Sequence, residues 1–141
     1  MNSGSRGHQP FQIALDLKSG LPVYRQIVDQ VMLGIVSGSL VTGDQLPTVR
    51  QLAVDLSINP NTVLRAYRDL ESRGAIETHQ GSGTFIGDPK LDRSDVERQR
   101  HLDQMAGTFL ARAAAAGFTI KEIIQCLKSF QTDGEQNRRK S

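Results

Sequence analysis

Two short amphipathic helices joined by a tight turn are predicted near the middle of the chain. Residues 49–56 carry apolar side chains at helical spacing, and Thr48 with Gln51 forms a capping-box sequence in front of them. Asn59 and Pro60 follow closely and favour a second helix, because Asn caps well and Pro loses no hydrogen bond at the first helical position. This pattern is typical of a helix-turn-helix.

The second predicted helix has an apolar side and a polar side. At about 100° per residue, the apolar side consists of Val63, Ala66, Tyr67 and Leu70, and the polar side of Asn61, Arg65, Arg68 and Ser72. An amide and two guanidiniums in line suit the major groove of DNA, because Asn pairs with adenine and Arg with guanine or phosphate. We also expect the start of this helix to offer free N–H groups to a phosphate. Many helix pairs that bind no DNA share this spacing, so the spacing alone does not decide whether this helix pair binds DNA.

A core helix and a β-hairpin are predicted on either side of the helix pair. Apolar residues at i+4 spacing predict a helix over residues 22–37, and residues 13–17 could form a short strand before it. Residues 45–46 are expected to pair with a later hairpin, whose strands lie near 75–79 and 84–86. A helix-turn-helix followed by a hairpin is a winged helix. The need for positive φ explains the glycines of its turn, and close approach to a phosphate is the alternative explanation.

Two further amphipathic helices are predicted after a break at Asp88-Pro89. Ser94 can cap the first, and Thr119 can cap the second. A two-helix tail cannot bury both apolar stripes by itself, so we expect it to pair with a second copy in a two-fold dimer. The alternative is that both stripes fold back on the winged helix of the same chain. The residues assigned to dimerisation are Leu102, Met105, Phe109, Leu110, Ile120, Ile123, Ile124 and Leu127.

The predicted fold is therefore mainly α with a small β-hairpin: a winged helix-turn-helix domain followed by a short two-helix dimerisation tail. Polar composition predicts that both ends of the chain are loose. The predicted segments are a flexible N-terminus (1–12), the DNA-binding domain (13–87), a charged linker and helix start (88–100), a helical dimerisation tail (101–131) and a disordered C-terminus (132–141).

Composition limits the classes of function. The 141 residues contain 38% hydrophobic side chains and no stretch of about 18 apolar residues, so we expect a cytoplasmic protein that does not bind membranes. The net charge is only +2, and within residues 1–87 seven basic residues balance seven acidic ones. A generic basic surface is absent. If the chain binds DNA, its positive side chains must be gathered on one surface.

Other chemistry has little support in the sequence. The single cysteine, Cys126, stands among apolar residues and is expected to be a small buried side chain, with an intermolecular disulfide as the alternative. His8, His79 and His101 have no partners at metal-ligand spacing. No catalytic residues occur at a usable spacing, so we expect no enzyme activity, no metal and no cofactor.

Four sequence motifs stand where this winged helix would need them. They are Pro22-Val-Tyr-Arg-Gln-Ile, Gly43-Asp-Gln-Leu-Pro-Thr-Val-Arg-Gln-Leu-Ala, Asn59-Pro-Asn-Thr-Val-Leu-Arg-Ala-Tyr-Arg-Asp-Leu and Gly81-Ser-Gly-Thr-Phe. In this order they resemble the DNA-binding domain of the GntR family of bacterial transcription regulators, over about residues 13–87. The Asn-Pro-Asn-Thr-Val segment and the short tail are most similar to the YtrA-like subfamily. The resemblance implies winged-helix DNA binding by a dimer.

The resemblance also implies which residues touch operator DNA. Many family members have Ser or Thr and Arg near the start of the recognition helix, where this chain has Pro60 and Asn61, so the base preference does not carry over. The alternative for the arginines is that they are solvated helix residues without a ligand. The matching positions are Arg50, Asn59, Asn61, Thr62, Arg65, Gln80 and Gly81, and Thr48, Arg68 and Ser82 complete the candidate DNA-binding set.

The leading hypothesis is a homodimeric transcription regulator, in particular a repressor, that binds an inverted-repeat operator in double-stranded DNA. A small-molecule effector, if one exists, would have to bind within the dimer bundle, because the chain has no length for a separate effector domain. The alternative hypothesis is a winged-helix protein-interaction module, which the nearly neutral charge of residues 1–87 leaves open.

Overall fold

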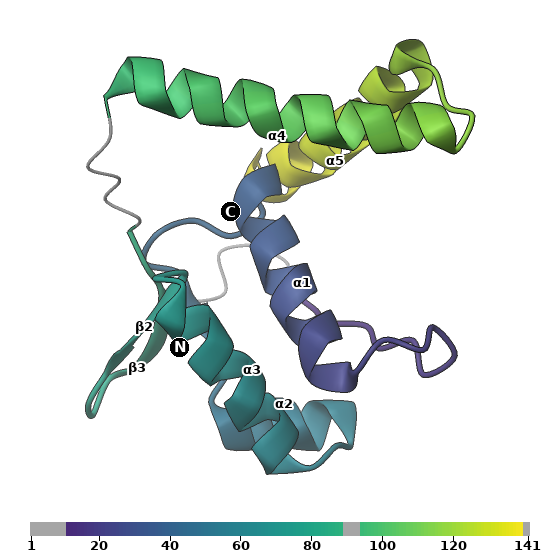
Figure 1. The fold of residues 1–141 in the computed structure, drawn as a ribbon. Coiled ribbons are helices and arrows are strands. Elements are labelled where there is room, and N and C mark those ends of the chain that lie inside the picture. The colour runs from purple at the N-terminus through teal and green to yellow at the C-terminus, as the bar shows by residue number, and fades with distance from the viewer. Residues whose placement is uncertain (1–10, 89–93, 140–141) are drawn as a thin grey trace. The chain divides into compact units, whose positions relative to one another are not determined.

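The computed structural model describes residues 11–88 and 94–139, with side chains up to residue 131. The chain divides into two compact units, one containing the chain up to residue 89 and the other residues 90–132. The first unit contains three helices and a three-stranded antiparallel sheet in the order β1-β3-β2 (Figure 1). Its elements are α1 (Val23–Ser37), β1 (Gln45–Leu46), α2 (Val49–Leu56), α3 (Pro60–Ser72), β2 (Ile76–His79) and β3 (Gly83–Ile86).

The predicted winged helix is confirmed. Strand β1 pairs with the hairpin as expected, with Gln45 opposite Phe85 in β3. Strands β2 and β3 form the wing, and Ile76 lies opposite Ile86 at its base. Helix α3 packs against both α1 and α2, so it stands between the two other helices of the unit.

The core of the first unit lies between these three helices and the base of the wing. Ile27 and Val31 of α1 meet Val63 and Leu70 of α3 there, and all four are essentially inaccessible to solvent. Burying side chains of this size contributes about 1.5–3 kcal/mol each. The orientation of α3 about its own axis is therefore fixed by its apolar side.

One buried hydroxyl links α3 to the segment just before α2. The Tyr67 Oη atom donates a hydrogen bond of 2.6 Å to the Pro47 carbonyl oxygen, just before α2. Burial raises the pKa of Tyr67, which keeps the hydroxyl neutral and able to donate. Tyr67 is thus a core residue, in agreement with its place on the apolar side of α3.

The helix ends follow the predicted capping sequences. Thr48 and Gln51 form a complete capping box at the start of α2, with both reciprocal hydrogen bonds present. Asn59 caps α3, and Ser57 adopts a left-handed conformation with φ of 56° in the turn between the two helices. A turn this tight fixes the angle between α2 and α3 because it leaves few free backbone torsions.

The predicted strand at residues 13–17 is wrong, because the segment forms no strand pairing and is held by side chains instead. Two glutamines of α1, one turn apart, bind its main chain. Gln30 accepts from the Ala14 N–H and donates to the Ala14 carbonyl oxygen, at 3.0 and 2.7 Å. Gln26 does the same with Asp16, at 2.8 and 3.0 Å, and is buried. These amides provide the hydrogen bonds that a neighbouring strand would have provided.

The predicted flexible N-terminus covers residues 1–12, of which residues 1–10 lie outside the described part of the chain. Phe11 packs against the core, with its ring beside the buried Gly34 of α1. The ordered domain therefore begins before residue 13.

The second unit, residues 90–132, contains α4 (Asp95–Ala115) and the part of α5 (Ile120–Arg139) that ends at residue 132. Ser94 caps α4 through the N–H of Glu97, and Thr119 caps α5 through the N–H of Glu122. The two helices do not pack along one another, and among their described side chains Ala113 alone is buried. Most of the apolar side chains of both helices are therefore exposed.

Two predictions for the tail are corrected by these helices. Disorder was expected from residue 132, but α5 continues to Arg139. Residues 132–139 include poor helix formers such as Asp133 and Gly134, so intrinsic helix propensity does not explain this continuation. Cys126 was expected to be buried, but its side chain is exposed on α5.

Two further kinds of feature are absent from the described residues. None of the described helices is long and apolar enough to cross a membrane. Within residues 11–88 and 94–131, no group of His, Cys, Asp or Glu side chains could hold a metal ion.

We expect Tyr67→Phe to lower the free energy of unfolding by about 1–2 kcal/mol, because the Pro47 carbonyl loses its donor in a part-buried site. Urea unfolding followed by circular dichroism measures this change. Tyr24→Phe is the matched control, since the Tyr24 hydroxyl makes no hydrogen bond among the described residues. A Tyr67→Phe variant as stable as the wild type would show that this bond does not contribute.

Candidate nucleic-acid interface

The polar side of α3 faces solvent, as the helical spacing predicts. Asn61, Arg65 and Arg68 are exposed, whereas the residues of the apolar side are buried. Thr62 lies between the two sides and is half-buried. Ser72, at the far end of the helix, donates its hydroxyl to the carbonyl oxygen of Asp69. The part of α3 available to a ligand is therefore its first three turns.

The start of α3 differs from the prediction in one respect. Its first N–H groups are not free, because Pro60 has none, Asn61 donates to the Asn59 side-chain oxygen at 2.8 Å and Thr62 donates to the Asn59 carbonyl oxygen at 3.0 Å. The expectation of a phosphate held by these N–H groups is thus wrong. The N-terminal end of α3 instead presents side chains to solvent, among them the exposed amide of Asn61.

The start of α2 contributes a second set of candidate residues. The Thr48 hydroxyl oxygen accepts the Gln51 N–H in the capping box, so the cap already uses one of its lone pairs. Arg50 is exposed in the first turn and lines a shallow surface depression together with Pro47 and Gln51. Its guanidinium is available to a ligand at this surface.

The wing tip contributes Gln80, Gly81 and Ser82, all of them exposed. The Ser82 N–H donates to the His79 carbonyl oxygen at 2.9 Å, which closes the turn. Gly81 has a φ of 83° and Gly83 a φ of 126°, conformations that favour glycine. The backbone of the turn therefore explains both glycines.

Two residues that the sequence analysis did not assign support the wing. The Gln45 side chain in β1 donates to the Ser82 carbonyl oxygen at 3.2 Å and so connects the sheet to the wing tip. The His79 ring packs against Phe85 at 5.5 Å between centroids, and its Nε2 atom lies 3.3 Å from Glu77. The predicted pairing of β1 with the hairpin is the signal that could have indicated Gln45.

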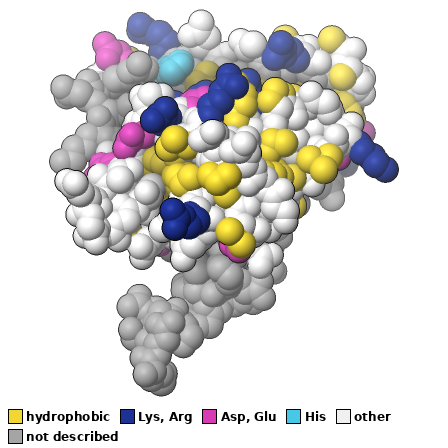
Figure 2. All heavy atoms as spheres, turned by 90° about the horizontal axis from the view of Figure 1, so that it is seen from below, with side chains coloured by type: hydrophobic (Ala, Val, Ile, Leu, Met, Phe, Trp, Pro, Cys, Tyr) yellow, Lys and Arg dark blue, Asp and Glu magenta, His cyan; other side chains and the backbone are white. Residues whose placement is uncertain are grey.

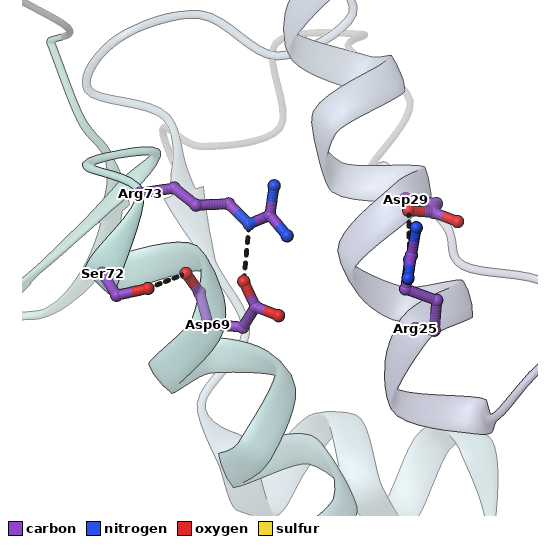
Figure 3. A network of polar contacts seen from close by, with 5 residues as sticks. All are labelled: Arg25, Asp29, Asp69, Ser72 and Arg73. Atoms are coloured by element: carbon purple, nitrogen blue, oxygen red, sulfur yellow. Dashed lines mark hydrogen bonds and ion pairs between the residues drawn. The ribbon is translucent and has the colours of Figure 1, made fainter.

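Two arginines of the first unit form ion pairs with neighbouring carboxylates. Arg25 pairs with Asp29 on α1, and Arg73 pairs with Asp69 on α3 (Figure 3). The hydrogen bond that Arg73 donates to the Asp69 carboxylate raises the pKa of Arg73. One pair neutralises a basic and an acidic side chain on α1, and the other does so at the C-terminal end of α3.

The arginines of the candidate set behave differently. Arg50, Arg65 and Arg68 are exposed and have no acidic partner among the described residues. The helices α2 and α3 thus present three exposed arginines without an acidic partner, although Asp55 on α2 and Glu71 on α3 are exposed as well. Figure 2 shows one face of the molecule, seen from below the view of Figure 1, with hydrophobic side chains across its middle and Lys and Arg side chains scattered around them.

Arg65 has an additional contact with α1. Its guanidinium carbon lies 3.8 Å from the centroid of the Tyr24 ring, which is a cation–π arrangement. The contact uses the flat face of the guanidinium and leaves its N–H groups, which lie in the plane, free to donate.

This fold, with unpaired arginines and an exposed amide on its recognition helix, defines a winged-helix protein of the kind that binds DNA. The family model described as bacterial regulatory proteins, gntR family, matches residues 23–86. The chain is 34% identical over 117 residues to the uncharacterized HTH-type transcriptional regulator YhcF of Bacillus subtilis, covering 83% of this chain and 96% of that protein. It is 32% identical over 121 residues to the HTH-type transcriptional repressor YtrA of the same organism, covering 86% and 93%.

Solved structures agree with these relatives. A transcriptional antiterminator from Listeria monocytogenes EGD-e superimposes with a TM-score of 0.65 at 30% identity, covering 86% of this chain and 91% of that chain. YtrA from Sulfolobus acidocaldarius, a GntR-family transcription factor, gives a TM-score of 0.53 at 32% identity, covering 73% and 97%. The chain belongs to the GntR family and is a DNA-binding transcription regulator, not an enzyme.

We expect Gly83→Ala to destabilise the first unit by about 1–3 kcal/mol, because alanine is strained at this φ. Its Cβ would also stand 2.6 Å from Gln45 Nε2, which would push the wing contact apart. Thermal unfolding measures the change. The control is Gly107→Ala, at a helical position in α4 with open space around it. Equal stability of Gly83→Ala and the wild type would contradict the assigned conformation.

Proposed function

We propose that the chain is a homodimeric repressor that binds an inverted-repeat operator, with one α3 helix in the major groove of each half-site. The observation that supports this most is that Arg50, Arg65 and Arg68 on α2 and α3 have no acidic partner among the described residues, whereas Arg25 is paired on α1 and Arg73 at the end of α3. The nearly neutral charge of the domain leaves a protein-interaction module as the alternative, and the three arginines without acidic partners favour DNA binding over it.

The candidate residues are proposed to play different roles. Asn61, with its exposed amide at the start of α3, is proposed to read a base edge, and Thr62 to support it. Arg50 and Arg68 are proposed to contact phosphates, which positions the helix in the groove. At the wing, the exposed tip residues are proposed to contact the neighbouring backbone or minor groove, with the glycine allowing close approach. The capping residues Thr48 and Asn59 then fix where the two helices begin.

The second unit supports the proposed dimer. Leu102, Met105 and Phe109 on α4 and Ile120, Ile124 and Leu127 on α5 are 46–60% exposed. Leu110 and Ile123 are only partly covered. Two long helices that leave this much apolar surface in water need a partner. A second copy of the tail offers the same stripes, so a two-fold bundle can bury both sets.

A two-fold dimer sets the expected geometry of the operator. The two α3 helices would reach half-sites about 10 bp apart centre to centre, or a multiple of that spacing. Repression is proposed because the similar protein YtrA of Bacillus subtilis carries the description of a repressor. An effector, if one acts, would bind within the tail bundle.

We expect Asn61→Ala to reduce the preference for the operator over unrelated DNA by about 5- to 100-fold, since a bidentate base contact is worth about 1–3 kcal/mol. Arg50→Ala should weaken binding to all duplexes and lower the slope of log affinity against log salt by about 1. Fluorescence anisotropy with a duplex selected from a random pool measures both. Arg25→Ala, whose guanidinium is paired on α1, is the matched control. Unchanged binding of both variants would remove these contact assignments.

We expect a double variant, Leu110→Asp with Ile124→Asp, to be monomeric, because charges would enter the apolar interface of the tail. Its affinity for the full operator should fall at least tenfold because two linked half-sites bind more tightly than one. Sedimentation equilibrium at micromolar concentration measures the mass. Val36→Asp, at an apolar position 79% exposed on α1, is the control and should remain dimeric. A monomeric wild type would overturn the role given to the tail.

A further inference from the structure

The contact between Arg65 and Tyr24 joins a candidate DNA-binding side chain to a helix that was assigned no part in binding. Tyr24 lies in the second position of α1, and its half-buried ring packs against the core. Arg65 lies on α3, with its guanidinium carbon 3.8 Å from the ring centroid. No carboxylate among the described residues pairs with this guanidinium, so the ring is its assigned partner.

The geometry of the contact leaves Arg65 able to bind. A guanidinium that lies over a ring uses its flat face, and all of its N–H donors remain in the exposed plane. An ion pair would have engaged at least one of those donors and offset the charge, as Asp69 does at the Nε atom of Arg73. The ring therefore restrains Arg65 without neutralising it.

The side on which the ring lies indicates what Arg65 binds. Asn61 and Arg68 are directed away from the core of the unit, whereas Tyr24 on α1 lies beside α3 and holds Arg65 towards that flank. When a helix lies in the major groove, its outward side faces the base edges and its flanks face the phosphates of the groove wall.

We propose that Tyr24 is a positioning residue for DNA binding, holding the Arg65 guanidinium so that its N–H groups meet a backbone phosphate beside α3. The restraint exists before DNA arrives. An arginine otherwise loses much side-chain freedom on binding, and an oriented one loses less. Tyr24 thus increases affinity for every duplex and leaves the choice of bases unchanged. This inference rests on the proposed placement of α3 in the major groove.

A double-mutant cycle on the full chain tests the inference, with fluorescence anisotropy on the selected operator duplex and on an unrelated duplex of equal length. Tyr24→Leu should weaken binding to both duplexes by about 2- to 5-fold, the range of an exposed cation–π contact. Tyr24→Phe keeps the aromatic face and should bind like the wild type. In an Arg65→Ala background, Tyr24→Leu should cause no further loss.

The salt dependence separates positioning from charge. Arg65→Ala should lower the slope of log affinity against log salt by about 1, because one phosphate contact is lost. Tyr24→Leu should leave that slope unchanged, since the charge is still present. In the free protein, the ring current of Tyr24 should shift the Arg65 side-chain proton resonances upfield. Tyr24→Phe should retain that shift and Tyr24→Leu should abolish it, a readout that needs no DNA.

Three results would overturn the inference. They are equal binding of Tyr24→Leu and the wild type, an equal loss from Tyr24→Leu with and without Arg65, or a loss restricted to the operator duplex. If Arg65→Ala binds normally while Asn61→Ala does not, the role of Arg65 fails and the proposed function stands. If neither variant affects binding to any duplex, the placement of α3 in the groove fails as well.

Discussion

The burial of one side of α3 is the constraint on which the DNA-binding surface depends. Val63, Ala66 and Leu70 are fully buried between α1, α2 and the base of the wing. Since successive helical residues are about 100° apart, this burial leaves Asn61 and Arg68 directed into solvent. A rotation of α3 by one residue would bury charge and expose the core, so packing energy selects the side that DNA can meet.

Several polar contacts keep the parts of this surface in fixed relation. Tyr67 ties α3 to the segment before α2, and Gln45 ties the sheet to the wing tip. Arg25 and Arg73 pair with neighbouring carboxylates, whereas Arg50, Arg65 and Arg68 on α2 and α3 have no acidic partner among the described residues. A net charge of only +2 is therefore compatible with DNA binding, because the distribution of charge matters more than its sum.

The sequence allowed the helix pair, its caps and the wing to be predicted, because these follow from local patterns such as Thr48 with Gln51. Contacts between distant segments could not be predicted in this way. The amides of Gln26 and Gln30 take the place of a strand partner for residues that lie 10 and 16 positions earlier in the chain. The stack of Arg65 on Tyr24 joins two different helices. Periodicity assigns a residue to a side of its helix but does not identify its partner on another element.

The most direct measurement is a titration of the 15N-labelled protein with a selected operator duplex, followed through its backbone amide resonances. If α3 enters the groove as described, the resonances of residues 48–51, 59–65 and 80–82 shift or broaden together. Those of exposed residues on α1 such as Leu33 and Val36 stay in place. Changes confined to the exposed surface of α1, or no change with any duplex, would contradict the account.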